Sequence, residues 1–230
     1  MDSSTPQISV ITVVYNDEEH IAKTIQSVID QKYDQLEFII IDGGSTDGTL
    51  DIIKIYEKNI DYWVSEPDDG IYAAMNKGIR VAKGDGLLFL NAGDFFIGDV
   101  LSNKIDIPCF LNVKYNNAFD KLVDIKIKNY KLGIPNCHQG IVFENKGLKY
   151  NLDYKVASDY DFYLRHGYTK LPFVGTSGYI YYDNEGFSKV NLFERDKEIA
   201  NIIDKNFNSF YTIYFKVMVN LKNIIRGYIK

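Results

Sequence analysis

The stretch ISVITVV, residues 8–14, decides the fold class of this chain. Its side chains are mostly β-branched and none is charged, which is typical of a strand buried on both faces of a parallel sheet. A second run of this kind, LEFIII, occupies residues 36–41 and ends at Asp42. The segment between them predicts a helix, capped by Asn16 or Asp17, because its apolar residues recur at helical spacing: Ile21, Ile25, Val28 and Ile29.

Strands and helices continue to alternate until about residue 100. The loop GGSTDGT has turn chemistry, and Ser45 or Thr46 is expected to cap the helix that follows it. A short strand at 61–66, a helix at 71–82 and a strand at 86–94 complete the series. Alternation with short connections predicts an α/β fold with a single doubly wound, mostly parallel sheet flanked by helices.

The second half of the chain, from residue 101, has a less regular pattern. Strands are expected at 107–113, 121–127 and 171–182. Helices are expected through Phe162 and Leu164, and through Ile199, Ile202 and Ile203.

The overall composition limits the class of protein. Hydrophobic residues make up 46% of the 230 residues, which predicts a folded domain, and the formal net charge of −5 argues against a nucleic-acid partner. The two cysteines, Cys109 and Cys137, form no CxxC pair, so neither a disulfide framework nor a zinc site is expected. MDSSTPQ does not have the pattern of a signal peptide, and no run of about 18 apolar residues is present, so we expect a cytoplasmic protein.

Polar residues follow the predicted strands at the ends where doubly wound sheets bind ligands. Asp42 could accept a hydrogen bond from a planar ligand edge, or it could belong to a plain turn. Asp94, with Asn91 nearby, could bind Mg²⁺ or Mn²⁺, which need only one or two protein carboxylates, or it could cap the next turn. The complete set of these residues is Asn16, Asp42, Glu66, Asp68, Asp69, Asn91 and Asp94.

Two long motifs carry a family resemblance: ISVITVVYNDEEHIAKTIQSVIDQKYDQLEFIIIDGGSTDGT at 8–49 and DDGIYAAMNKGIRVAKGDGLLFLNAGD at 68–94. They resemble the inverting glycosyltransferases of family 2, which have the GT-A fold, and among these the bacterial surface-polysaccharide enzymes. The resemblance implies a nucleotide-sugar-binding half at 1–100, an acceptor and catalytic half of the same domain at 101–206, and a basic amphipathic C-terminal helix at 207–230.

The resemblance also implies a set of donor-binding residues. Tyr15 and Asp42 would lie against the nucleotide base, with Asp69 nearby. The full set is Val13, Tyr15, Asn16, Glu18, Asp42, Asp69, Asn76, Lys77, Asn91, Ala92 and Gly93.

The family usually carries Asp-x-Asp or Asp-Asp at the tip of the fourth strand, and in the Asp-Asp form the second member binds the metal. Here the sequence reads Asn91-Ala92-Gly93-Asp94. Asp94 is therefore the expected ligand of Mg²⁺ or Mn²⁺, and Gly93 stands where the partner carboxylate would be. Because of this departure, a catalytically impaired nucleotide-sugar-binding module is one alternative.

Family members also carry an acidic catalytic base before a helix in the second half, and VASDYDFYLR at 156–165 matches that element. Inversion at the sugar requires a base that takes the proton of the acceptor hydroxyl. Asp159 is the expected base and Asp161 is its rival, although Asp161 also has capping-box spacing to Ser158. NCHQG at 136–140 resembles a His-Gln element bordering the acceptor pocket, so His138 and Gln139 are expected there. NEGFS at 184–188 resembles a late turn near the active site.

Residues 205–230 carry five cations and no acidic residue. On a helical wheel the cations from Lys216 onward and two asparagines share an arc of roughly 160°, and apolar residues fill the rest. Such a helix is expected either to pack on the core or on a partner subunit, or to lie in the membrane interface, which would suit a lipid-linked acceptor.

Together these features predict an enzyme that transfers a hexosyl or N-acetylhexosaminyl group, with inversion, from a nucleotide-diphosphate sugar to a hydroxyl of a glycan or lipid-linked glycan. A UDP-sugar is the expected donor, and a GDP-sugar is the alternative. Capsule, exopolysaccharide or O-antigen synthesis at the inner face of the cell membrane is the expected setting. A nucleotidyltransferase would instead need a Gly-rich basic loop after the first strand, where this chain has the acidic VYNDEEH.

Overall fold

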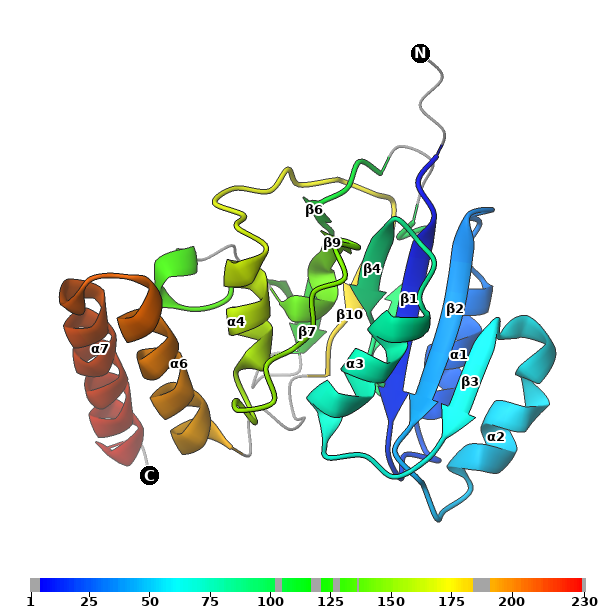
Figure 1. The fold of residues 1–230 in the computed structure, drawn as a ribbon, viewed down its shortest axis with the longest axis horizontal. Coiled ribbons are helices and arrows are strands. Elements are labelled where there is room, and N and C mark those ends of the chain that lie inside the picture. Colours follow the sequence, from blue (N-terminus) through cyan, green and yellow to red (C-terminus); the bar gives the residue numbers. More distant parts are fainter. Residues whose placement is uncertain are drawn as a thin grey trace.

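A six-stranded sheet runs through the molecule (Figure 1). The computed structural model describes residues 5–101, 105–116, 121–125, 129–135, 137–183 and 191–228, with side chains as far as residue 221. Four parallel strands lie in the order β3-β2-β1-β4, and β9 and β6 extend the sheet in antiparallel pairing beyond β4. The strands are β1 (Ile8–Val14), β2 (Leu36–Asp42), β3 (Tyr62–Ser65), β4 (Gly86–Phe89), β9 (Ile141–Glu144) and β6 (Cys109–Phe110).

Different helices cover the two faces of this sheet, as in the doubly wound arrangement that the sequence predicted. α1 (Ile21–Ile29) and α2 (Thr49–Ile55) lie on one face, and α3 (Ile71–Val81) and α4 (Ser158–Arg165) lie on the other. Alternate residues of β1 serve both cores, since Val10 packs with α1 and Ile11 packs with α3. α3 can approach β1 closely because a Cβ at Gly78 would lie only 2.5 Å from Cγ2 of Ile11.

A second sheet of four strands, in the order β5-β10-β7-β8, is present in addition to the single sheet that the sequence predicted. These strands are β5 (Phe95–Ile97), β10 (Tyr179–Tyr181), β7 (Val113–Asn116) and β8 (Leu122–Asp124). The chain leaves the main sheet at a turn in which Gly93 adopts the left-handed conformation, with φ at +92°. β5 then pairs with β10, so the end of β10 returns to the tip of β4.

Two of the expected strands in the second half have different bounds in the structure. The segment at 107–113 is divided between β6 of the main sheet and Val113 of the second sheet. The segment at 171–182 forms β10 and one isolated bridge from Phe173 to Phe110. Gly175 and Gly178 interrupt this segment, and glycine in a strand interior weakens pairing.

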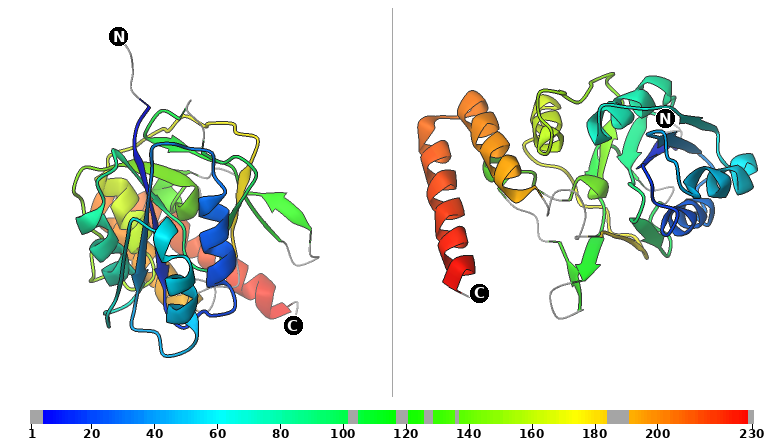
Figure 2. Two further views of the ribbon diagram at one scale, coloured as in Figure 1. Left: turned by 90° about the vertical axis from the view of Figure 1, so that its right-hand side faces the viewer. Right: turned by 90° about the horizontal axis from the view of Figure 1, so that it is seen from below.

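The last two helices, α6 (Leu192–Asn206) and α7 (Ser209–Tyr228), pack side by side at the end of the molecule away from β3 (Figures 1 and 2). They contact α4 and the short helix η2 (Tyr130–Leu132). Ile202 and Ile203 of α6 join Tyr154 and Tyr160 in a small separate core. Two further 3-10 helices are η1 (Glu57–Asn59) and η3 (His138–Gly140). No helix in the described ranges is both long and apolar enough to span a bilayer.

The predicted caps of α1 and α2 are wrong, because both helices begin later than their patterns suggested. The side chains of Asn16 and Ser45 instead form hydrogen bonds in the loops after β1 and β2. Asn16 Oδ1 accepts a hydrogen bond from the Thr46 N–H at 2.8 Å, and the Ser45 hydroxyl donates to the Asp42 carboxylate at 2.5 Å. These bonds fix the loops after β1 and β2 against each other at the edge where the strands end.

Candidate active site

The carboxyl ends of β1, β2 and β3 meet at the lower edge of the sheet in Figure 1. Asp42 is fully buried there, and its carboxylate accepts four hydrogen bonds: from the N–H groups of Gly44 and Ser45 and from the hydroxyls of Ser45 and Ser65. This carboxylate holds the loop after β2 in place. Its expected contact with a ligand stays a prediction, and both carboxylate oxygens already have protein donors.

An aromatic ring and a carboxylate lie beside a glycine at the same edge. A Cβ at Gly43 would lie 3.0 Å from Oδ2 of Asp68 and 3.4 Å from Cδ2 of Tyr15. The Tyr15 side chain is 65% exposed, so its ring offers an open surface. Asp69, the residue expected here, is exposed beside Asp68. Sequence patterns do not distinguish the two neighbouring aspartates, because their positions depend on how the loop after β3 folds back.

Three residues of the expected donor-binding set support the loops around this edge. Glu18 Oε2 accepts a hydrogen bond from the Gly48 N–H at 2.6 Å, and the Asn16 N–H donates to the Ser45 hydroxyl at 2.7 Å. Val13 is buried, and its carbonyl accepts from the Ala92 N–H beyond the end of β4. These contacts show that the three residues position the loops, and their direct contact with a donor stays a prediction.

Asn76 and Lys77 on α3 are engaged with the protein itself. The Asn76 amide forms two hydrogen bonds with the backbone of Tyr150, donating to its carbonyl at 3.0 Å and accepting from its N–H at 2.7 Å. Lys77 Nζ lies 3.0 Å from the Glu66 carboxylate and donates to the Pro67 carbonyl at 3.1 Å. They tie two loops to α3, and their contact with a donor stays a prediction.

The turn after β4 holds Asp94 firmly. The Asp94 N–H donates to the Asn91 carbonyl, and the Thr24 hydroxyl on α1 donates to the Asp94 carbonyl at 2.7 Å. The same Thr24 oxygen accepts from the Gly93 N–H at 3.2 Å. On the other side, the Asp183 N–H donates to Oδ1 of Asp94 at 2.8 Å. Asp94 is only 3% exposed, so its carboxylate is positioned by α1, β4 and the end of β10 together.

Burial raises the pKa of Asp94 well above its usual value, and the charge of Asp183 raises it further, while hydrogen bonds from the Asp183 N–H and the Gln139 side chain lower it. A divalent cation would favour the ionised form of such a carboxylate. In the same turn, Oδ1 of Asn91 is buried and has no hydrogen-bond partner among the described residues. Carboxylate and amide oxygens are the donors that Mg²⁺ and Mn²⁺ prefer, so this turn fits the expected metal. In the described ranges, no group of three or more acidic, histidine or cysteine side chains forms a metal cage.

Asp159 lies in the first turn of α4 and is partly buried. Its Oδ1 accepts a hydrogen bond from the Tyr160 N–H at 2.8 Å, and the Tyr72 hydroxyl lies 3.5 Å from the same oxygen. Burial raises the pKa of Asp159 to about 6, against the opposing effects of these two donors and of Arg195. A carboxylate with this pKa is ionised at neutral pH and is still basic enough to accept a proton.

Asp161, the rival base, has a structural partner. Its carboxylate lies 2.7 Å from Nε of Arg165, one turn further along α4, and the side chain is 13% exposed. The predicted capping box with Ser158 is wrong, because Ser158 is already the first residue of the helix and its hydroxyl donates to the Asn151 carbonyl at 2.8 Å. The structural role of Asp161 is therefore the ion pair with Arg165, not a helix cap.

His138 and Gln139 of η3 are both buried, at 6% exposure each. The His138 ring stacks on Phe89 with a centroid distance of 5.0 Å, and its Nε2 is hydrogen-bonded to the Tyr150 hydroxyl. Burial lowers the pKa of His138 to about 3, so the ring is neutral. Gln139 contacts the Asp94 side chain and accepts a hydrogen bond from the Cys137 thiol at 2.7 Å. The acceptor role of both residues stays a prediction, and Gln139 already supports Asp94. Asn136 and the expected late turn at 184–188 lie outside the described residues.

Tyr182 is influenced by the charges of both the expected metal ligand, Asp94, and the expected base, Asp159. Its phenol is largely buried, and the charges of Asp94, Asp159 and Asp183 are all close enough to raise its pKa further. No sequence pattern indicated Tyr182 or Asp183, because only the pairing of β5 with β10 returns them to the tip of β4. The charges of Asp94 and Asp159 therefore both act on one phenol.

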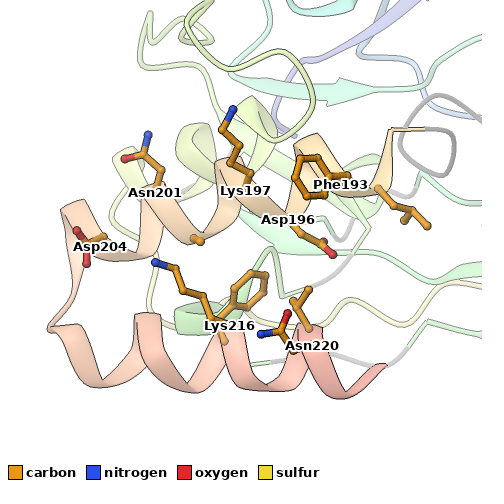
Figure 3. A pocket seen from close by; sticks show the side chains of 11 residues that line it. Phe193, Asp196, Lys197, Asn201, Asp204, Lys216 and Asn220 are labelled. Atoms are coloured by element: carbon orange, nitrogen blue, oxygen red, sulfur yellow. The ribbon is translucent and has the colours of Figure 1, made fainter. Parts of the chain in front are cut away.

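Two surface hollows lie elsewhere. One, of about 690 Å³, lies between α6 and α7, where Asp196, Lys197 and Lys216 are among the residues that line it (Figure 3). The other, of about 640 Å³, lies between α1 and β5. Neither is lined by the residues gathered at the strand ends.

Comparison with known proteins identifies the class. The model of glycosyl transferase family 2 matches residues 9–106. An uncharacterised glycosyltransferase of Mycobacterium tuberculosis H37Rv is 34% identical over 184 residues, which is 71% of this chain and 70% of the relative. A PGL/p-HBAD biosynthesis glycosyltransferase of Mycobacterium bovis BCG is 33% identical over 187 residues and covers 70% of each chain. A putative teichuronic acid biosynthesis glycosyltransferase of Bacillus subtilis, TuaG, is 38% identical over 109 residues, 46% of this chain and 43% of the relative.

Solved structures show the same fold. S. aureus TarS superposes with a TM-score of 0.62 at 18% identity, over 84% of this chain and 39% of that one. TarS 1–349 in complex with UDP-GlcNAc gives a TM-score of 0.62 at 17% identity over 88% of this chain and 67% of that one. The Pyrobaculum calidifontis mannosyltransferase PcManGT, in complex with GDP-Man and Mn²⁺, gives 0.61 at 15% identity over 88% and 64%.

The fold is therefore the GT-A fold of glycosyltransferases, as the resemblance implied. With the family model and relatives of 33–34% identity over most of its length, this chain belongs to glycosyl transferase family 2.

Proposed function

We propose that this glycosyltransferase transfers a sugar, with inversion, from a nucleotide-diphosphate sugar to a hydroxyl of a glycan or lipid-linked glycan. The proposal is supported by two carboxylates whose charges both act on the Tyr182 phenol: Asp94, in an oxygen-rich turn, and Asp159, with a pKa of about 6. These are the two kinds of group that the transfer needs: one for the diphosphate and its metal, the other for the acceptor proton.

The donor nucleotide would bind at the ends of β1 to β3. The exposed Tyr15 ring offers a face for stacking a base, and the Asp68 carboxylate beside Gly43 offers an acceptor for its N–H groups. Asp42 and Asp69 complete the acidic surroundings. A UDP-sugar is our preferred donor because TarS was solved with UDP-GlcNAc, and the GDP-Man complex of PcManGT keeps a GDP-sugar as the alternative. The sugar that we propose, a hexosyl or N-acetylhexosaminyl group, is compatible with either nucleotide.

The chemistry needs a leaving group and a base. A Mg²⁺ or Mn²⁺ ion, when bound, supplies positive charge to the departing diphosphate. Asp94 and Asn91 would hold that ion. Asp159 would remove the proton of the acceptor hydroxyl. At the same time the hydroxyl oxygen would form a bond to the anomeric carbon, and the bond from that carbon to the diphosphate oxygen would break. Attack from the face opposite the leaving group inverts the anomeric configuration.

The setting that we propose is the assembly of a bacterial surface polysaccharide. The putative teichuronic acid enzyme TuaG supports it, since it is 38% identical to this chain over 109 residues. A catalytically impaired binding module remains the alternative, based on Gly93. A binding module and an active enzyme would share the donor-side features described above, but the raised pKa of Asp159 favours the active enzyme.

A donor panel tests the function. The protein is incubated with Mn²⁺ and UDP- or GDP-linked hexoses and N-acetylhexosamines, and release of nucleotide is followed together with proton NMR of the sugar anomer. We expect release from one donor class and an inverted anomer, even where water is the acceptor. Release with a retained anomer would contradict inversion, and the absence of release from every donor would favour the binding module.

We further propose that α7 contacts the membrane. Phe210, Ile213, Tyr214, Val217 and Leu221 are each at least 44% exposed and share an arc of roughly 100° on the helix. The opposite side packs on α6 and η2 through Thr212 and Phe215. An exposed apolar stripe on a segment with five cations and no acid is complementary to an anionic bilayer surface.

A further inference from the structure

Asp94 is the single acidic side chain of the turn after β4, since residues 91 to 93 are Asn, Ala and Gly. One carboxylate and one amide oxygen lie at the low end of what holds Mg²⁺ or Mn²⁺ in proteins, which is one or two carboxylates together with substrate phosphates. Other carboxylates near the turn are therefore of interest, including those that come from distant parts of the sequence.

Asp183 is brought to this turn by the pairing of two strands. β10 runs antiparallel to β5, with Tyr181 opposite Phe95 and Ile180 opposite Phe96. Extending the same register by two residues places Asp183 opposite Gly93. The hydrogen bond from the Asp183 N–H to Asp94 Oδ1, at 2.8 Å, fixes this approach across 89 residues of sequence.

The side chain of Asp183 points toward the position that a side chain at Gly93 would occupy. A Cβ built on Gly93 would lie 4.0 Å from Cβ and 3.9 Å from carboxylate Oδ2 of Asp183. Directly opposed residues of antiparallel strands have Cβ atoms about 4.5–5.5 Å apart, so this contact is that of a close cross-strand pair. The carboxylate of Asp183 thus lies close to the region that an aspartate at position 93 would reach.

We infer that Asp183 is a second carboxylate ligand of the divalent cation, supplied across the strands in place of a side chain at Gly93. The inference rests on the proposed function, because it needs a metal at Asp94. Asp183 lies at the exposed rim, whereas Asp94 is buried, so the pair would hold the ion between the protein interior and the diphosphate of the donor. Asn91 Oδ1 in the same turn is a third oxygen available to the site.

This arrangement also accounts for a glycine at position 93. The left-handed backbone there, with φ at +92°, disfavours any other residue, and a carboxylate on it would face Asp183 directly. The site thus gains its second charge from a position where the backbone is unstrained.

Binding of Mn²⁺ in the presence of saturating UDP tests the inference, measured by electron paramagnetic resonance of the free ion. Asp183→Asn removes the charge and keeps the N–H that holds Asp94. We expect it to weaken Mn²⁺ binding by roughly 10- to 100-fold, a loss of the size seen when groups that support a metal site are removed. Asp183→Glu should retain binding within a few-fold. Asp99→Asn, an exposed acid on the loop after β5, is the matched control and should leave binding unchanged.

The readout separates this inference from the proposed function. Wild-type Mn²⁺ affinity in Asp183→Asn, combined with loss of binding in Asp94→Asn, would overturn the inference and leave the metal at Asp94 alone. A wild-type protein that binds UDP and no Mn²⁺ would overturn the metal part of the proposed function and this inference with it. Equal weakening in Asp183→Asn and Asp99→Asn would also overturn it, because the effect would then be one of overall charge.

Discussion

Asp159 and Asp161 lie two residues apart on α4 and are held in different ways. Asp161 is neutralised by its ion pair with Arg165, whereas Asp159 has hydrogen-bond donors and no cation within ion-pair distance among the described residues. Burial without a close positive charge is what raises the pKa of a carboxylate toward the working pH. The difference assigns them distinct expected roles, in catalysis for Asp159 and in helix stability for Asp161.

Substitution separates the two roles. We expect Asp159→Asn to lower kcat by at least about 100-fold, since general-base catalysis contributes roughly 10² to 10⁴-fold, and to leave donor affinity unchanged. Asp161→Asn breaks the ion pair and should lower Tm with little effect on kcat. Nucleotide release at saturating donor and thermal unfolding of both variants check this. Equal losses of kcat in the two variants would refute the assignment of Asp159.

The pH dependence follows from the same group. Because the pKa of Asp159 in the folded protein is about 6, kcat should fall as the pH is lowered through 6. The folded-state pKa lies above the usual value of 3.8, so the folded protein binds the proton more tightly than the unfolded chain. Wild type should therefore lose stability relative to Asp159→Asn as the pH rises from about 4 to about 6, by at most about 3 kcal/mol. Denaturant titrations of both proteins across this range provide the measurement, and parallel curves would contradict a buried Asp159.

At the level of single residues, sequence patterns predicted where a residue lies better than they predicted which groups it contacts. Asp94 was expected at a strand end and is there, because an apolar run followed by a polar turn marks that end reliably. Asp183 was not singled out, and Asp68 was named only among the residues at the strand ends, since their contacts depend on pairing between β5 and β10 and on the path of one loop. His138 and Asn76 show the reverse case, where a polar residue in a promising motif is already bonded to the protein.

At the level of elements, the four parallel strands could be predicted because each is a short, mainly apolar run followed by turn residues. The helix starts could not, since the side-chain oxygens of Asn16 and Ser45 each accept a hydrogen bond from a backbone N–H of the opposite loop. The second sheet was also missed. Strands were expected at 121–127 and 171–182, which contain β8 and β10, but a strand pattern does not show which strands pair. β5 has only three residues, too few for a periodic pattern to identify.

α7 gives a prediction at this scale. If its exposed stripe contacts anionic lipid, the protein should co-sediment with vesicles containing phosphatidylglycerol and much less with neutral phosphatidylcholine vesicles. Ile213→Ser with Val217→Ser should reduce that binding, because both side chains belong to the stripe. Ile55→Ser on α2 is the control, an isoleucine that is 77% exposed far from α7. Loss of dimers in the double variant, with no vesicle binding by wild type, would show that the stripe is a subunit interface instead.

At the level of the whole molecule, we propose that the first half of the chain binds the donor and that the second half completes the site. β10 and α4, both from the second half, carry Asp183, Tyr182 and Asp159 to the tip of β4. The α6–α7 pair lies at the end of the molecule away from β3 and the nucleotide edge (Figure 2). Such a layout suits a donor bound at the sheet edge and an acceptor that arrives from the side of α4 and α6.

We propose that a metal and a nucleotide bind together at Asp94, and calorimetric titration with UDP and GDP is the measurement to make first. Each nucleotide is titrated with and without Mn²⁺ into wild type and Asp94→Ala. We predict that one nucleotide, UDP, binds in a Mn²⁺-dependent way and that this binding is lost in the variant. Binding that needs no metal and survives the substitution would contradict the account.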